Sequence, residues 1–405
     1  MAPPSPPLPS SGEFLKSIRE SSRSLRKAQN VTIAPSSIRR LLVSPAFTKT
    51  YHRIASTSHG LALPLNFSSP LAELNLLSIL SLLNIASGYR IPLHQQTGRG
   101  AWDSIRAFVF GLYLTSSAGA EGDLMSARGM KDIGDTKVAE LLGVNLHVER
   151  PHESIPGVTV GELGGPGWEL VQLLKGLLNE TGDILVNNGY KDLGAFVLEA
   201  LKESERAGKE KGDDAMVEVI LERLVRAIPG FQDMGMVGNQ PVYCFKKALF
   251  LINGIAIRFG HLSPPPFPVP RTASIPVFTD NVLPSILIHL GVIDLSSAAC
   301  HHFFGPAPEI AADDERDDNQ KEVPKEGPVL TTEQAYILRA AAIDACELIV
   351  EYARAMDVDE LKEQGLEWLR DITLPDLDNW IWAVAKDRLD YRKLERFVLR
   401  NTVFF

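Results

Sequence analysis

The sequence predicts a mainly α-helical protein. Apolar residues recur at the three-and-four spacing of helix faces along most of the 405-residue chain, whereas a convincing strand signal occurs in a single short stretch. Strands do not alternate with helices, which argues against a parallel α/β sheet. With 45% hydrophobic residues and a mean hydropathy near zero, the chain can bury a large core. We therefore expect a compact helical fold with a small β-hairpin.

The N-terminal 30 residues differ in composition from the rest of the chain. Residues 1–11 are rich in proline and serine and are expected to be disordered, whereas residues 13–28 can form a basic helix. We therefore separate an N-terminal head, residues 1–30, which we expect to be dispensable for catalysis, from a single helical domain, residues 31–405. An acidic, proline-containing stretch at about 306–328 interrupts this domain, and we expect it to be a disordered surface insertion.

Helical periodicity recurs in order along the domain. Ser36 or Ser37 can cap its first helix, and Thr331 or Thr332 a long later one, because hydroxyl groups accept hydrogen bonds from the unpaired N–H groups of a helix start. The helices that we expect lie within residues 31–51, 71–86, 101–114, 168–187, 193–205, 216–227, 245–259, 283–290, 332–355 and 358–370.

Glycine and proline mark the segments between these helices. Residues 237–243 are the one convincing strand pair, with Gly238 and Asn239 as the tight turn. Residues 156–167 contain five glycines without the strand-then-helix context of a nucleotide fold, which indicates a loop. The proline-rich residues 263–270 predict an extended strap.

Charge and cysteine content argue against several classes of protein. The formal net charge is −9, whereas a protein that coats DNA or RNA needs a basic surface. Cys244, Cys300 and Cys346 are far apart in the sequence, which suits reduced thiols. No His and Cys group has metal-ligand spacing, so we expect no metal and no cofactor. No apolar run has the length of a membrane span and no secretory signal is evident, so we expect a cytoplasmic protein that binds no membrane.

Residues 276–291 place a carboxylate in an apolar setting. Leu283 and Leu290 lie on one face of a predicted helix, and Gly291 occurs where that helix should end. Asp280 therefore lies at or just before a helix N-terminus. This position alone fits a capping residue, because a carboxylate accepts hydrogen bonds from the first N–H groups of a helix.

Several motifs add a second interpretation of this stretch. Together with Phe278-Thr279-Asp280, they resemble, from about residue 31 to the C-terminus, the queuosine salvage protein family. Its members are N-glycosidases that release the base queuine from queuosine 5′-phosphate, and the resemblance implies a helical architecture similar to that of DNA glycosylases. The other motifs, in order, are Leu65-Asn66-Phe67, Leu178-Asn179-Glu180-Thr181-Gly182, Phe245-Lys246-Lys247-Ala248, Leu377-Asp378-Asn379-Trp380-Ile381-Trp382 and Phe404-Phe405.

The resemblance implies a catalytic role for Asp280. Breaking a ribose–base bond builds positive charge on the sugar, and a carboxylate beneath the anomeric carbon can stabilise that charge or attack it. A covalent route and an ion-pair route both stay open. Lys246 begins a predicted helix and is expected to bind the 5′-phosphate, and Phe278 is expected to stack on the base.

Other residues are expected to recognise the base. The carboxylate of Asp378 suits the donor edge of a guanine-like ring, because it accepts hydrogen bonds from amino and ring N–H groups. Asn379, the next residue, is assigned to the same base pocket, although relatives have an aromatic residue there. The family also has a histidine near the start of the domain that contacts the base; His52 and His59 are the candidates here, and we select His59.

These residues predict a hydrolase that cleaves the N-glycosidic bond of queuosine 5′-phosphate. The expected partner is this nucleotide, not a nucleic-acid polymer, and we expect a monomer. One alternative is a non-catalytic helical scaffold that binds partners through the proline strap and the acidic insertion, and another is a nucleic-acid glycosylase. The burial of Asp280 and Asp378 would distinguish the hydrolase from the scaffold, because a scaffold needs no inward-facing carboxyl groups at these positions.

Overall fold

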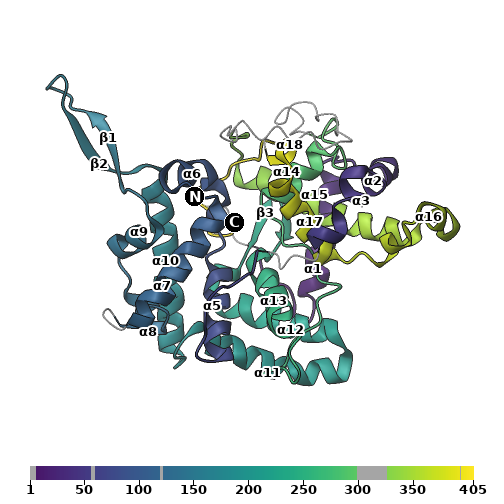
Figure 1. Cartoon of the computed structure of the whole chain (residues 1–405), viewed down its shortest axis with the longest axis horizontal. Coiled ribbons are helices and arrows are strands. Elements are labelled where there is room, and N and C mark those ends of the chain that lie inside the picture. Colours follow the sequence, from purple (N-terminus) through teal and green to yellow (C-terminus); the bar gives the residue numbers. More distant parts are fainter. Residues whose placement is uncertain (1–5, 56–59, 119–121, 299–325, 393) are drawn as a thin grey trace. The chain divides into compact units, whose positions relative to one another are not determined.

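The computed structural model describes residues 6–55, 60–118, 122–298, 326–392 and 394–405. Within these residues the fold is mainly α-helical, as predicted, and it contains two small antiparallel sheets of two strands each (Figure 1). The acidic insertion predicted at about 306–328 lies almost entirely outside the described residues, as does His59.

The chain divides into two compact units, and each is described by itself. Unit 1 comprises Met1–Leu65, Ser204–Glu222 and Asp233–Leu399, and unit 2 comprises Asn66–Glu203, Arg223–Gln232 and Arg400–Phe405. The division falls within α11 (Leu193–Lys211) and α12 (Asp213–Ala227). The single domain of residues 31–405 stays a prediction.

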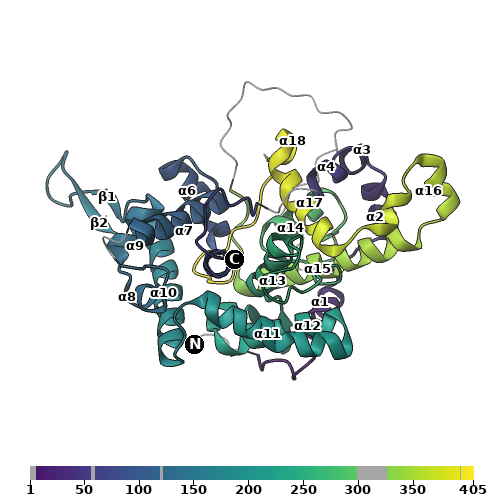
Figure 2. The same cartoon turned by 60° about the horizontal axis from the view of Figure 1, so that its bottom comes forward.

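Unit 1 contains the predicted site. Its central helix is α15, which packs against α1, α2, α14 and α17 (Figures 1 and 2). The elements of unit 1 are α1 (Phe14–Ala28), α2 (Pro35–Leu42), α3 (Pro45–Thr48), α4 (Tyr51–Ala55), β3 (Met234–Val237), β4 (Gln240–Tyr243), α13 (Lys246–Phe259), α14 (Val282–His289), α15 (Thr332–Ala355), α16 (Val358–Gln364), the 3₁₀ helix η3 (Glu367–Asp371), α17 (Leu374–Asp387) and α18 (Leu389–Arg392).

The first residue of α15 is fixed by a capping box. The Thr331 hydroxyl accepts the N–H of Gln334 at 3.3 Å, and the Gln334 side chain accepts the N–H of Thr331 at 2.8 Å. Two N–H groups that the helix itself leaves unpaired are thereby satisfied. Of the two caps that the sequence allows, the structure therefore selects Thr331.

The basic helix predicted in the N-terminal head is present as α1, and it is part of the core of unit 1. Phe14, Leu15 and Ile18 are buried on its inner face. The side-chain carboxylate of Glu218 in α12 accepts the N–H groups of Phe14 and Leu15, and so caps the start of α1. Asp344 of α15 accepts hydrogen bonds from arginines further along α1. The head was expected to lie apart from the domain, but its helix contributes apolar side chains to the packing of unit 1.

Two predicted helical regions of unit 1 are interrupted. Residues 31–51 form two short helices and the start of a third, because Pro45 begins α3 and cannot continue α2. The helix predicted at 358–370 ends at Gln364, where Gly365 adopts a left-handed conformation with φ 66°, and η3 follows.

In unit 2, residues 74–82 of α5 are all buried. The sequence predicted a helix at residues 71–86, and Ser69 caps α5 by accepting the N–H of Ala72 at 3.2 Å. The elements of unit 2 are α5 (Pro70–Leu82), the 3₁₀ helix η1 (Ala86–Tyr89), α6 (Arg90–Thr97), α7 (Ala101–Ala118), α8 (Ala127–Asp132), α9 (Asp135–Leu142), β1 (His147–Pro151), β2 (Thr159–Leu163), α10 (Gly165–Asn187) and the 3₁₀ helix η2 (Pro229–Phe231).

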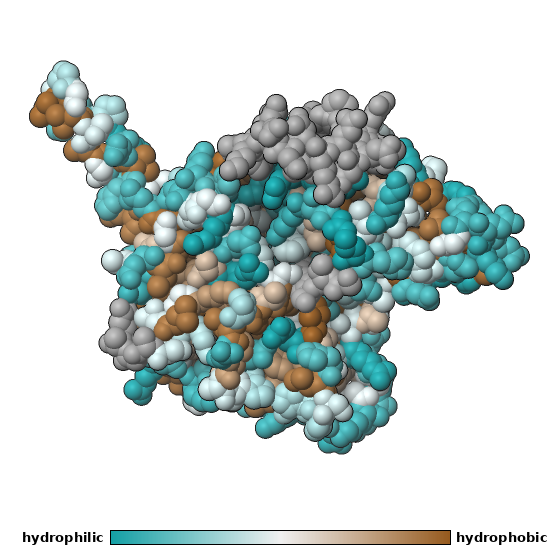
Figure 3. Space-filling view, viewed as in Figure 1, coloured by the Kyte–Doolittle hydropathy of each residue, from teal (hydrophilic) through white to brown (hydrophobic). Residues whose placement is uncertain are grey.

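The two β-hairpins differ in how well the sequence predicts them. β3 and β4 pair antiparallel around Gly238, as expected. The loop predicted at residues 156–167 was wrong, because β2 pairs there with β1 and the two strands project as a ribbon from unit 2 (Figure 1). Both faces of this ribbon are exposed, and hydrophobic and hydrophilic residues mix on it (Figure 3). A strand without a buried face lacks the alternation by which strands are recognised.

Among the described residues, no single helix has the length and apolar composition needed to cross a membrane. One bent pair, Pro70–Leu82 with Ala86–Thr97, meets both criteria only when its two helices are taken together.

Candidate active site

The structure places Asp280 two residues before the first residue of α14, just before a helix N-terminus as the sequence predicted. Its Oδ1 accepts the N–H of Val282 at 2.6 Å, so the capping interaction is present. The surrounding segment is buried, with Val277 1% and Phe278 3% exposed, and Asp280 itself is 7% exposed. A carboxylate that only caps a helix does not need this burial, since water can solvate it at a surface.

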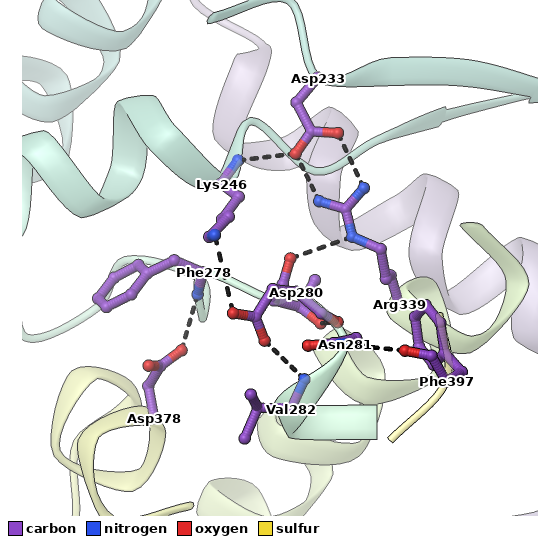
Figure 4. Close-up of polar contacts among 10 residues, drawn as sticks. Asp233, Lys246, Phe278, Asp280, Asn281, Val282, Arg339, Asp378 and Phe397 are labelled. Atoms are coloured by element: carbon purple, nitrogen blue, oxygen red, sulfur yellow. Dashed lines mark hydrogen bonds and ion pairs between the residues drawn. The ribbon is translucent and has the colours of Figure 1, made fainter. Parts of the chain in front are cut away.

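Lys246 supplies a positive charge beside Asp280. It is the first residue of α13, and its Nζ lies 3.7 Å from Asp280 Oδ2 (Figure 4). Burial lowers the pKa of Lys246, and the negative charge of Asp280 opposes that shift. The sequence suggested a phosphate-binding role at a helix start; in the structure this ammonium is buried next to the predicted catalytic carboxylate.

Asp378 of α17 reaches the same segment from another side. Its Oδ2 accepts the backbone N–H of Phe278 at 2.8 Å (Figure 4). Burial raises the pKa of Asp378 well above its ordinary value, the nearby Asp280 charge raises it further, and the Phe278 hydrogen bond and Lys246 oppose the shift. Lys246 thus pairs with Asp280, and Asp378 binds the backbone two residues before Asp280; we call these three residues of unit 1 the buried cluster.

The buried cluster contains one cation and two carboxyl groups. Two carboxylates close together in a low-dielectric interior do not both ionise readily, and one ammonium balances only one of them. The raised pKa of Asp378 means that its carboxyl group keeps a proton to higher pH than an ordinary aspartate does, and Lys246 lies beside Asp280. The two carboxyl groups therefore stand in different electrostatic surroundings, as paired carboxyl groups do in glycosidases.

A second buried ion pair lies next to the cluster, and the sequence did not reveal it. Arg339 of α15 and Asp233, just before β3, are both 0% exposed. The guanidinium donates from Nη1 to Asp233 Oδ1 at 2.9 Å and from Nη2 to Oδ2 at 2.5 Å (Figure 4). A signal was available for one partner, because Arg339 is a charged residue on an otherwise apolar helix face.

Phe278 and Asn379 lie beside the cluster but make other contacts. The Phe278 ring meets Phe250 edge-on, with centroids 5.9 Å apart. The Asn379 side-chain Nδ2 donates to the carbonyl oxygens of Ile54 and Ala55, each at 3.2 Å, and so binds the end of α4. Their predicted base contacts stay predictions.

The remaining candidates are placed as follows. His59 is outside the described residues. His52, the alternative histidine, is exposed on α4, with its ring centroid 4.3 Å from that of Trp368. Trp380, beside Asp378 in the sequence, is buried and donates from Nε1 to the Thr50 hydroxyl at 2.9 Å. Trp380 is therefore a core residue of unit 1.

No cluster suited to metal binding occurs in the described parts of the chain: no three His, Cys, Asp or Glu side chains come together to hold an ion there. Cys244 and Cys346 are free and buried, and burial raises the pKa of the Cys244 thiol to about 12. A thiol that stays protonated is a poor nucleophile and a poor ligand. Burial raises the pKa of the Cys346 thiol as well, so both thiols lack the lowered pKa of reactive cysteines.

The motif at residues 178–182 has a structural position in unit 2. Asn179 of α10 donates from Nδ2 to the carbonyl oxygens of Met130, Lys131 and Ile133, at 2.9, 2.8 and 3.1 Å, and so satisfies the end of α8. At Gly182 a Cβ would lie 2.3 Å from the backbone nitrogen of Lys131. This motif therefore fixes the close crossing of α8 and α10.

Comparison with known proteins gave no match: no protein-family model and no curated protein sequence matches the chain. Membership of the queuosine salvage family therefore stays a prediction from the resemblance.

Proposed function

We propose that this protein hydrolyses the N-glycosidic bond of queuosine 5′-phosphate and releases queuine. The observation that supports the proposal most is the buried cluster, in which Lys246 pairs with Asp280 and Asp378 binds the same backbone segment, although the three residues are far apart in the sequence. Burial of three ionisable groups costs free energy, and such groups are concentrated where they do chemistry.

In the proposed reaction, Asp280 acts on the sugar. Its carboxylate stabilises the positive charge that develops at the anomeric carbon, or attacks that carbon, and water then completes the hydrolysis. Asp280 is the most exposed member of the cluster, which fits the group that meets the substrate. Lys246 supplies the opposite charge that keeps a carboxylate in this setting energetically acceptable.

Asp378 recognises the base in this proposal. It shares the Phe278 segment with Asp280, since the Phe278 N–H binds Asp378 and the Asp280 carboxylate follows two residues later. A ligand that brings N–H donors or positive charge favours the ionised carboxyl group. The guanine-like edge and the cationic side chain of queuine are such a ligand.

The burial of both carboxyl groups supports an enzyme over a scaffold. A scaffold that binds partners through the proline strap or the acidic insertion has no use for the charges of Asp280 and Asp378 in its interior, 7% and 1% exposed. The net charge of −9 also disfavours a nucleic-acid glycosylase, which needs a basic face for its polymer.

The decisive experiment is a base-release assay. The purified chain is incubated with queuosine 5′-phosphate, queuosine and guanosine 5′-phosphate, and free base is separated by chromatography. We expect queuine from the first substrate and no guanine from the third. Asp280→Asn, prepared in the same way, controls for a contaminating glycosidase. Failure of the wild-type chain to release base from queuosine 5′-phosphate would refute the proposal.

A further inference from the structure

The Asp233–Arg339 ion pair calls for an explanation beyond stability. Both side chains are 0% exposed, and the two are joined by two parallel hydrogen bonds. Removing two charges from water is costly, so a well-packed apolar pair of similar volume is often at least as stable. A buried pair of this kind is better explained by what it holds in place.

The pair contacts both halves of the buried cluster. On one side, Asp233 Oδ2 accepts the backbone N–H of Lys246 at 3.1 Å. On the other, Arg339 Nε donates to the carbonyl oxygen of Thr279 at 3.0 Å, one residue before Asp280 (Figure 4). A single ion pair therefore connects the first residue of α13 to the backbone that carries Asp280.

The backbone before Lys246 is held in an uncommon conformation. Phe245 has φ 46° and ψ 35°, the left-handed region that bulky side chains rarely adopt. The carbonyl oxygen of Asp233 accepts the N–H groups of Cys244 at 3.0 Å and Phe245 at 3.1 Å. Such strain persists only where the surroundings impose it, typically at functional sites.

We propose that Asp233 and Arg339 are positioning residues, which hold the Lys246 ammonium opposite the Asp280 carboxylate. Their role in turnover rests on the proposed function. Neither residue touches the substrate in this scheme; they act through Lys246 and Thr279. Loss of either should therefore lower kcat more than it raises KM, because the charges fail to align as the sugar cation develops.

The test compares two ion pairs on the same helix. Asp233→Asn and Arg339→Lys disturb the positioning pair, whereas Asp344→Asn disturbs the partly buried pair of Asp344 with Arg26, 2.6 Å apart, in the contact between α15 and α1. With all variants folded by circular dichroism, we expect kcat to fall about 100-fold in the first two. Asp344→Asn should stay within about threefold of wild type, since it leaves the geometry of the cluster unchanged. Equal loss in Asp344→Asn, or wild-type kcat in Asp233→Asn, would overturn the proposal.

A second readout separates this inference from the proposed activity. Hydrogen exchange, read by mass spectrometry, should become faster over residues 243–247 and 277–283 in Asp233→Asn and Arg339→Lys but not in Asp344→Asn. If wild type releases no queuine, the proposed function fails while the exchange data still decide the positioning role. Unchanged exchange in both segments overturns it, whatever the activity. Arg339→Lys keeps the positive charge, so the experiment does not depend on Asp233→Asn being folded.

Discussion

Two regions whose motifs carry the same sequence resemblance differ in what those motifs contribute to the structure. In unit 1, the motifs around Lys246, Asp280 and Asp378 bring charged side chains together in a buried cluster. In unit 2, the motif with Asn179 and Gly182 brings two helix backbones together and contains no buried charge. Burial of ionisable groups makes the first arrangement costly for folding, a cost that the proposed activity would explain, whereas the second contributes hydrogen bonds and close packing to the fold.

This difference gives each motif a distinct signature under mutation. Changes to the buried cluster should alter activity while the fold persists, and some should stabilise the protein, because functional charges are retained at the expense of stability. Changes at the α8–α10 crossing should alter stability first.

The largest effect is expected for Asp280→Asn. The amide can still accept the Val282 N–H but cannot offset positive charge on the sugar, so kcat for queuine release should fall by roughly 10²–10³-fold with the fold intact. Asp357→Asn is the matched control, because Asp357 caps α16 at the surface by accepting the Glu360 N–H at 2.9 Å. Asp280→Asn with activity within a few-fold of wild type would reduce Asp280 to a helix cap.

Gly182→Ala should be the most destabilising change at the α8–α10 crossing. The added methyl group would meet backbone atoms of Lys131 and Ala127, which cannot move independently, and about 3 kcal/mol of stability should be lost. Gly176→Ala on the same helix meets nothing within 4 Å and should gain about 0.5–1 kcal/mol. Chemical denaturation measures both. Equal stabilities of the two variants would show that α8 and α10 do not cross as closely as described.

Asn179→Ala should have a smaller effect of the same kind. It removes three hydrogen bonds to the end of α8, and we expect a loss of about 2 kcal/mol. Asn188→Ala, which removes one exposed bond to Ile184 at the end of the same helix, should cost about 0.5 kcal/mol. Denaturation curves give both values. If Asn179→Ala instead abolished turnover without a loss of stability, the motif would have a role in catalysis and not only in helix packing.

Asp378→Asn tests the cluster through pH. The folded-state pKa of Asp378 is raised, so the folded protein retains a proton that the unfolded chain releases, and wild-type stability falls as pH rises above the ordinary carboxyl range. Asparagine does not titrate and can still accept the Phe278 N–H. The free energy of unfolding of the variant, relative to wild type, should therefore rise by up to about 1.4 kcal/mol per pH unit until the pH exceeds the raised pKa.

The control for this titration is Asp183→Asn, whose stability relative to wild type should change with pH in the opposite direction. Lys131 lowers the pKa of the exposed Asp183 through a 2.6 Å contact, so Asp183→Asn should lose a little stability at neutral pH and none in acid. Denaturation at a series of pH values distinguishes the two slopes. A pH-independent difference between wild type and Asp378→Asn would contradict a retained proton.

The sequence predicted the parts of the fold that strong local patterns specify. The long helices α10, α13 and α15 follow apolar periodicity, and Asp280 was recognisable as a carboxylate in an apolar run before a helix. Boundaries were less accurate where single residues decide them, as at Gly365. The β1–β2 ribbon was missed because neither of its faces is buried.

The Asp233–Arg339 pair shows why a site is harder to predict than a fold. Its two residues are 106 positions apart, and the sequence around either one gives no indication of its partner. Asp233 precedes a short strand and resembles an ordinary turn residue. The lone arginine on the apolar face of α15 indicates that a buried partner must exist, but only tertiary structure identifies it.

The left-handed Phe245 also has a consequence for handedness. Along an extended strand, successive N–H groups point to opposite sides, so neighbouring amides cannot all face one residue. The φ and ψ angles of Phe245 lie between its own amide and that of Lys246, and their left-handed values turn the Lys246 N–H toward Asp233, whose Oδ2 accepts it at 3.1 Å. The carbonyl oxygen of the same aspartate accepts the amides of positions 244 and 245. A right-handed conformation at 245 would turn the Lys246 amide away from Asp233, and α13 would begin in another direction.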